Sequence, residues 1–419
     1  MAQASLIDHG EPAQLTLGFQ AALAVVFLPF ACGYFFSYFF RTVNAMVAPD
    51  LQRDIGLNAE QLGLLSAAYF LTFATCQIPL GVLLDRFGPR RVQGTLYAVA
   101  ALGALVFSFG DSVATLFVGR AIIGIGVSGG LMAALKAIVL WFPRERIALV
   151  NGWYIACGGL GVLAATQPVA FALEFTDWRG LFVILAIATL CAGALILLVV
   201  PEKPGMAAQG SLREQIAAVV QIYRSRYFWR ITPVMFTCAS ASMAIQGLWA
   251  GPWLADVAGL PREEIAPILL STAAFFTLGV FLSGPFAAAM LRLGLNIGGA
   301  SNVAAVCYTG AVLWIVCLPD VSPYVPWALF GFLGTLTSLV FAGLAAHFPA
   351  THVGRANTAC NVLVFGFAFG YQYGIGAVVE LWQPLADGGY PALAYVTAFL
   401  AVIATQIVAI VWYLLAPTD

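Results

Sequence analysis

Residues 81–91 read GVLLDRFGPRR and separate two long apolar runs. One acid and three arginines lie within seven residues of this stretch, and Gly88 and Pro89 supply residues that favour a turn. A membrane-spanning helix needs about 20 apolar residues. Arginine-rich loops between such helices stay on the cytoplasmic side. The stretch therefore predicts a tight cytoplasmic turn between two membrane-spanning helices.

The composition extends this interpretation to the whole chain. Of its 419 residues, 62% are hydrophobic and 9% are charged, whereas soluble domains carry about 25% charged residues. The net charge of −1 gives no reason to expect nucleic-acid binding. The eight cysteines lie in apolar segments without a CxxC pair, which indicates packing residues and no disulfide or metal site. We expect no cofactor and no metal.

The two halves of the chain repeat one another. The turn at 56–60 follows Pro49, and the turn at 259–263 follows Pro252, a shift of 203 residues. Related halves of this kind are typical of transporters whose binding site lies between two bundles. We predict an all-α membrane protein with twelve transmembrane helices in two pseudo-symmetric six-helix bundles.

The predicted organisation has four parts. We expect a cytoplasmic N-terminal tail at 1–18, the first bundle at 19–200, a cytoplasmic linker at 201–228 and the second bundle at 229–416. The first predicted helix covers residues 20–48, and the linker contains a short amphipathic helix from Leu212 to Tyr223.

Charge predicts the orientation in the membrane. With the N-terminus inside, twelve lysines and arginines face the cytoplasm, and only Arg53, Arg179 and Arg262 face outward. The positive-inside rule then places both termini in the cytoplasm. We expect a multi-pass protein of the cell (inner or plasma) membrane.

The first stretch also resembles the signature between helices 2 and 3 of the major facilitator superfamily. The residues that match the signature are Gly81, Asp85, Arg86, Gly88, Arg90 and Arg91. Arg120 with Gly124 resembles the fourth-helix motif of that superfamily. The resemblance implies alternating access by rocking bundles. It also implies that Asp85 meets the N-terminus of helix 11, near Arg355, and holds the cytoplasmic side shut.

Three cations lie within the predicted spans, namely Arg41, Arg120 and Lys136, and no acid lies in the middle third of any span. Ionisable groups inside a membrane are costly and usually functional. Cations without a counter-acid favour an anionic substrate. Tyr34 and Tyr38 share a helix face with Arg41, which we place roughly 10 Å from the outer helix end. This face offers donors to a carboxylate or a phosphate.

Two resemblances bear on these cations. The run around Arg41 resembles helix 1 of the organophosphate:phosphate antiporters, in which the matching arginine binds the substrate phosphate. The second arginine of that family, on helix 7, is absent, because Arg41 aligns with Ala244 in the repeat. The region around Lys136 resembles the anion:cation symporters, which carry organic anions such as hexuronates. Two alternatives stay open: Lys136 snorkels to the interface, and Asp50 or a helix carbonyl neutralises Arg41.

Four further side chains are candidates for substrate binding. Gln246 and Trp249 lie on helix 7, and Asn361 and Gln372 lie on helix 11. Hydrogen bonding between helices is the competing explanation for each of them.

The sequence thus predicts a secondary active transporter for a small organic anion, either a carboxylate or a phosphate ester. We expect it to work as a monomer in the lipid bilayer, with a coupling proton or a counter-anion as open alternatives. The competing functions are a drug/proton exporter and a nitrate transporter of the same fold. An enzyme is not expected, because no HExxH motif and no pair of carboxylates occurs within the predicted membrane spans.

Overall fold

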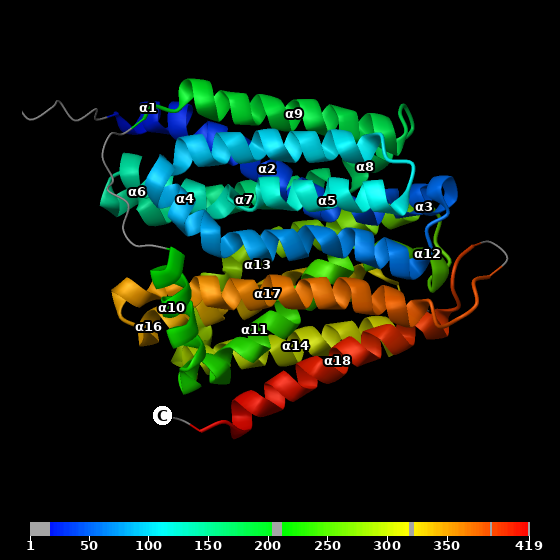
Figure 1. The fold of residues 1–419 in the computed structure, drawn as a ribbon. Helices are drawn as coiled ribbons and strands as arrows, with labels where there is room; N and C mark the ends of the chain where they lie inside the picture. The colour runs from blue at the N-terminus through cyan, green and yellow to red at the C-terminus, as the bar shows by residue number, and fades with distance from the viewer. Residues whose placement is uncertain (1–16, 203–211, 318–321, 386–387, 418–419) are drawn as a thin grey trace, which may run out of the picture.

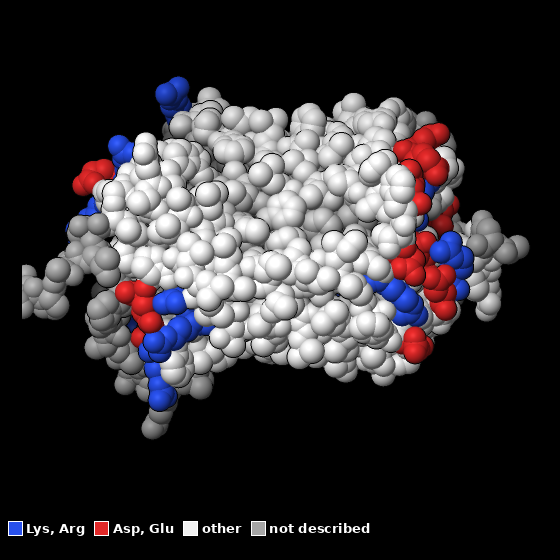
Figure 2. Space-filling view, turned by 90° about the horizontal axis from the view of Figure 1, so that it is seen from above, with Lys and Arg blue, Asp and Glu red and all other residues white. Residues whose placement is uncertain are grey.

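The computed structural model describes residues 17–202, 212–317, 322–385 and 388–417. Most of the predicted N-terminal tail and the middle of the predicted linker lie outside the described residues. The described helices run roughly parallel to one another, and α10 crosses them at one end (Figure 1). Charged side chains gather at the two ends of the face in Figure 2, with a broad uncharged band between them. Lipid tails require such a band.

The first half of the chain consists of helices that pass back and forth between the two ends. These are α1 (Phe19–Ala22), α2 (Leu28–Thr42), α3 (Asn44–Ile55), α4 (Ala59–Ser108), α5 (Val113–Val127), α6 (Gly130–Trp141), α7 (Ile147–Ala164), α8 (Gln167–Ala172) and α9 (Trp178–Val199). A π-helical turn at Leu23–Phe27 joins α1 to α2.

The linker helix and the second half follow the same plan. They comprise α10 (Leu212–Tyr223), α11 (Arg226–Ala244), α12 (Ala250–Asp256), α13 (Arg262–Arg292), α14 (Ile297–Cys317), α15 (Tyr324–Leu336), α16 (Val340–His347), α17 (Ala350–Val379) and α18 (Ala392–Leu415). A π-helical turn at Ile245–Trp249 joins α11 to α12. The helix α10 has the bounds that the sequence predicts.

Eleven helices of the described part are long and apolar enough to cross a membrane. The helix α4 is counted once among them, although its 50 residues would extend about 75 Å if they were straight. Gly88, at φ 76° and ψ 163°, divides α4 into two arms that run in opposite directions (Figure 1). With both arms counted, the predicted all-α membrane fold of two six-helix halves is confirmed.

The bend at Gly88 is tied to the end of α9. Arg90 Nε donates to the carbonyl oxygen of Leu197 at 3.0 Å. Arg91 donates to both carboxylate oxygens of Glu202, at 2.7 and 2.9 Å. These arginines therefore fix the turn at residues 81–91.

The first helix extends beyond the predicted span of 20–48, so the predicted end of this helix was wrong. Pro49 lies inside α3, which continues to Ile55. Proline has no N–H, so the carbonyl of Ala45 lacks its usual helical partner. The backbone of Gly251 in α12 packs directly on that carbonyl, where a Cβ would clash. The neighbouring helix thus covers the defect that proline creates.

The molecule has two ends, a linker end and a far end. The linker end holds the bend at Gly88, α10 and the C-terminus, and the far end holds α3 and α12 (Figure 1).

The bend generates a first prediction. The substitution Gly88→Ala should lower the free energy of unfolding by about 1–3 kcal/mol, because the backbone there is accessible essentially to glycine alone. Chemical unfolding in detergent measures this loss. Gly366→Ala is the control, because a Cβ on this helical glycine meets open space. An equal loss in both variants would contradict the strained bend.

Candidate functional site

A cavity of about 560 Å³ lies between the two halves, and both halves line it. This volume is typical of a site for a small molecule. The lining comes from the middle of the helices and from their linker-side parts. Side chains that matter for its chemistry are Tyr34, Tyr38, Arg41 and Tyr69 from the first half, and Ser242, Gln246, Thr335 and Asn361 from the second.

Arg41 is the one formally charged side chain among the described residues that line the cavity. Its guanidinium carbon lies 3.7 Å from the ring centroid of Tyr38, within range of a cation–π interaction. In the described part of the chain Arg41 forms no ion pair. The acid weighed as its partner, Asp50, pairs with two other arginines. The charge of Arg41 is therefore available to a ligand.

The longer first helix changes the depth of Arg41. Fourteen residues separate it from Ile55, a rise of about 21 Å, so it lies deeper than the predicted 10 Å. The hydroxyl of Tyr34 donates to that of Tyr38 at 3.2 Å. The ring of Tyr34 stacks on that of Tyr154 at 4.5 Å. The predicted stripe of two phenols and a guanidinium thus stands on one wall of the cavity.

Gln246 from the second half lies beside this wall. The neighbouring Gly247 is so close to the first helix that a Cβ there would lie 3.1 Å from the backbone oxygen of Arg41. The side chain of Gln246 is buried, and its Nε2 has no hydrogen-bond partner. An unpaired buried amide is costly, and Gln246 is among the residues that line the cavity.

Lys136 does not line the cavity. Its Nζ lies 2.6 Å from Oδ1 of Asp85 and donates to the backbone oxygen of Leu84 at 2.9 Å. The pair joins α6 to the linker-side part of α4. Within the described part of the chain, Asp85 makes no hydrogen bond or ion pair with α17. In this conformation Asp85 therefore pairs with Lys136. The contact with helix 11 (α17) that the superfamily resemblance implies is not formed among the described residues.

Arg120 has a structural position. It is 1% exposed, and its Nη1 donates to the backbone oxygen of Phe40 at 3.0 Å. It thereby fixes the first helix next to Arg41. Gly124, one turn farther along α5, packs against the backbone of Tyr69 in α4, where a Cβ would clash.

Trp249 and Gln372 lie on the far-end side of the cavity and do not line it. The indole Nε1 of Trp249 donates to the backbone oxygen of Gln372 at 3.1 Å. Both side chains are about 1% exposed. Gly63 of α4 packs on the backbone oxygen of Gln372. A Cβ added to Gly63 would lie 2.7 Å from that oxygen. These residues close the two halves against each other instead of facing the cavity.

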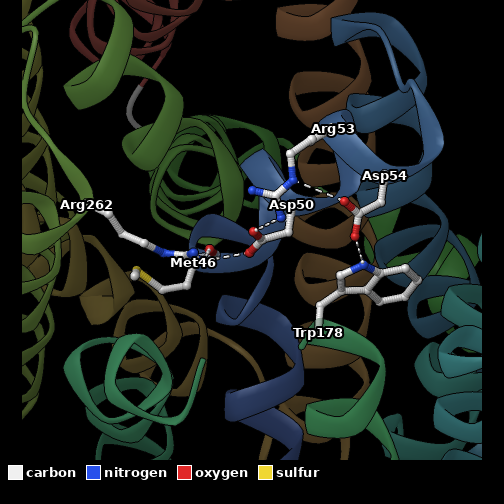
Figure 3. Close-up of polar contacts among 6 residues, drawn as sticks. All are labelled: Met46, Asp50, Arg53, Asp54, Trp178 and Arg262. Atoms are coloured by element: carbon white, nitrogen blue, oxygen red, sulfur yellow. Dashed lines mark hydrogen bonds and ion pairs between the residues drawn. The ribbon is translucent and has the colours of Figure 1, made fainter. Parts of the chain in front are cut away.

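An ion pair joins the two halves at the far end (Figure 3). Asp50 of α3 accepts from Arg53 of the same helix at 2.9 Å and from Arg262 at 2.7 Å. Arg262 begins α13 in the second half, and it also donates to the backbone oxygen of Met46. The first helix, in its α3 part, and α13 are thus locked together.

A second far-end contact involves Glu380, at the end of α17. Its carboxylate accepts from the backbone N–H of Ala59 at 3.0 Å and from the hydroxyl of Tyr390 at 2.6 Å. Burial, with this hydrogen bond, raises the pKa of Tyr390 to about 12, so the phenol stays protonated at neutral pH. Nearby, Tyr373 donates to Glu60 at 2.6 Å.

These far-end contacts were not predicted from the sequence. The available signal was positional, because Ala59 and Arg262 occupy equivalent places in the repeated turns at 56–60 and 259–263. The partner acids Asp50 and Glu380 carry no motif that marks them.

Comparison with known proteins agrees with this architecture. A sequence model of the Major Facilitator Superfamily matches residues 30–371. The probable sulfoacetate transporter SauU of Cupriavidus necator is 26% identical over 372 residues, covering 81% of this chain and 84% of that protein. The hexuronate transporter of Escherichia coli K12 is 26% identical, covering 74% and 78%.

Two further similarities are narrower in what they show. The nitrate/nitrite transporter NrtP of a Picosynechococcus strain is 30% identical over 136 residues, which cover 32% of this chain and 25% of that protein. The crystal structure of a bacterial homolog to the human lysosomal transporter Spinster, inward-facing and unoccupied, superposes with a TM-score of 0.77. It is 18% identical and covers 95% of this chain and 98% of that one, which shows the fold alone.

The far-end ion pair generates a second prediction. Arg262→Gln should weaken the closed far end by roughly 1.5–3 kcal/mol, the contribution of a hydrogen bond to a charged group. Spin labels at Glu174 and Glu263, both exposed at the far end, should then report longer distances. The labels require a variant without the eight native cysteines.

Arg53→Gln is the matched control for this measurement. Arg53 contacts the same carboxylate of Asp50 but belongs to the same helix, and its side chain is 72% exposed. Its loss should leave the distances unchanged. Equal distributions for the parent and both variants would show that the pair with Arg262 does not hold the far end closed.

The pair at the linker end generates a third prediction. Asp85→Asn and Lys136→Met should each destabilise the protein, and the double variant should lose less than the sum. We expect an interaction free energy of about 0.5–3 kcal/mol from this double-mutant cycle, measured by chemical unfolding in detergent. Strict additivity would mean that the 2.6 Å contact contributes nothing to stability.

Proposed function

The chain belongs to the Major Facilitator Superfamily, and from that premise we propose that it carries a small organic anion across a membrane by alternating access. The observation that carries the proposal is Arg41, a guanidinium in the cavity between the halves that no acid of the described part of the chain neutralises. A desolvated arginine recognises carboxylate and phosphate groups well, because its donors match two oxygens at once.

The relatives support the same class of substrate. Those that align over most of this chain are named for sulfoacetate and hexuronate, which are organic anions. The galacturonate transporter of Dickeya chrysanthemi, 26% identical over 275 residues, adds a third.

We propose that the linker end faces the cytoplasm, since arginines of the bend and of α10's surroundings gather there. The cavity then reaches from mid-membrane toward the cytoplasm while Asp50, Arg262 and Glu380 close the outside. In the opposite state these contacts part. The release of Asp85 from Lys136 lets it meet the start of α17, as the resemblance implies.

The coupling follows from the charges of the cavity. No acid lies among its described lining residues, so a carboxylate carrier for a proton is absent from that lining. Two coupling mechanisms are consistent with such a lining. Either the substrate is exchanged for a counter-anion, or a proton is carried together with the substrate.

Binding provides the fourth prediction. A carboxylate or a phosphate ester at a hundred times its dissociation constant should stabilise the purified protein by about 2.7 kcal/mol. Arg41→Ala should abolish this stabilisation, and Arg41→Lys should keep part of it. A thermal-shift screen in detergent with carboxylates, phosphate esters, nitrate and lipophilic cations measures the effect.

Arg292→Ala is the control, because this exposed arginine at the end of α13 lies away from the cavity. Stabilisation by lipophilic cations alone would contradict the proposal and favour a drug exporter. Stabilisation by nitrate alone would favour an inorganic anion instead.

A further inference from the structure

The charges available in the cavity limit the charge of its ligand. Arg41 is the one formal charge among the described lining residues. The other two membrane cations are already engaged, Arg120 with the carbonyl of Phe40 and Lys136 with Asp85. Neither of them lines the cavity. One positive charge is therefore all that these walls offer.

A second negative charge on the ligand would meet an unfavourable wall. The second half lines the cavity with the apolar side chains of Met235, Met243, Phe276, Phe341 and Phe365 and with uncharged polar side chains such as Ser242, Thr335 and Asn361. A charge buried without a partner carries a large desolvation cost. The same surface favours an apolar body, through burial of apolar area and contacts of sulfur with aromatic rings.

The place of a second cation is taken by an amide. Gln246 stands on the helix that packs on the backbone of Arg41, and its buried Nε2 has no partner. A carboxylate offers about four acceptor positions, which a guanidinium and one amide donor can share. These two side chains come from different halves, and both residues line the same cavity.

We infer that the site takes a monovalent organic anion with an apolar body. Its single carboxylate or sulfonate is held by Arg41 of the first half and Gln246 of the second. This inference rests on the proposed function and narrows it, because it excludes divalent anions, among them sulfoacetate and phosphate esters, as the preferred substrates.

Matched ligands test the inference on the full-length protein in detergent. The probes are benzoate with isophthalate, and hexanoate with adipate, each pair differing by one ionised carboxylate. Apparent dissociation constants come from thermal-shift titrations at pH 7.5. We expect each monoanion to bind at least tenfold more tightly than its dianion.

Gln246→Arg should reverse this preference, because it adds the missing second cation at the same position. Gln246→Met, which is neutral and similar in volume, is its control and should weaken the monoanions without favouring the dianions. The comparison of ligands on the parent protein stands even if a variant fails to fold.

The outcomes separate the two proposals. Dianions that bind as tightly as the monoanions or more so, with binding lost in Arg41→Ala, would overturn the monovalent site and leave anion transport in place. Binding of none of the four probes, or binding that survives Arg41→Ala, would overturn the proposed function and the inference with it.

Discussion

One electrostatic constraint distinguishes the cavity, because the guanidinium of Arg41 there has no counter-charge among the described residues. A buried charge is costly unless something neutralises it. Of the other two membrane cations, Lys136 is neutralised by Asp85, and Arg120 donates to a backbone carbonyl outside the cavity. Arg41 lies over the ring of Tyr38 and forms no ion pair with the described residues. An anion, the substrate that we propose, would supply the missing charge.

The first helix links this site to the far end. It carries Arg41 at the cavity and Asp50 nine residues later, about 13.5 Å along the axis. The tight packing of Gly247 and Gly251 on the same helix places the second half directly against it. The proposed anion contacts the first helix and the segment Ile245–Trp249, whereas Arg262 ties the first helix to α13. Binding and closure therefore share the first helix.

Much of the fold could be predicted from the sequence, because apolar length, charge bias and a repeat act locally. The stripe of Tyr34, Tyr38 and Arg41 followed from helical spacing. The end of the first helix could not, since Pro49 is tolerated only because Gly251 covers a carbonyl from another helix. Likewise the pairing of Asp85 with Lys136 depends on how two distant segments meet. The periodicity of apolar residues along the sequence does not predict contacts between the two halves.

A crystal structure with 4-bromobenzoate would test the central claim most directly. The account predicts an anomalous peak for bromine among the apolar side chains of the cavity, with the carboxylate between the guanidinium of Arg41 and the amide of Gln246. A ligand bound outside the cavity, or one whose carboxylate points away from Arg41, would contradict it.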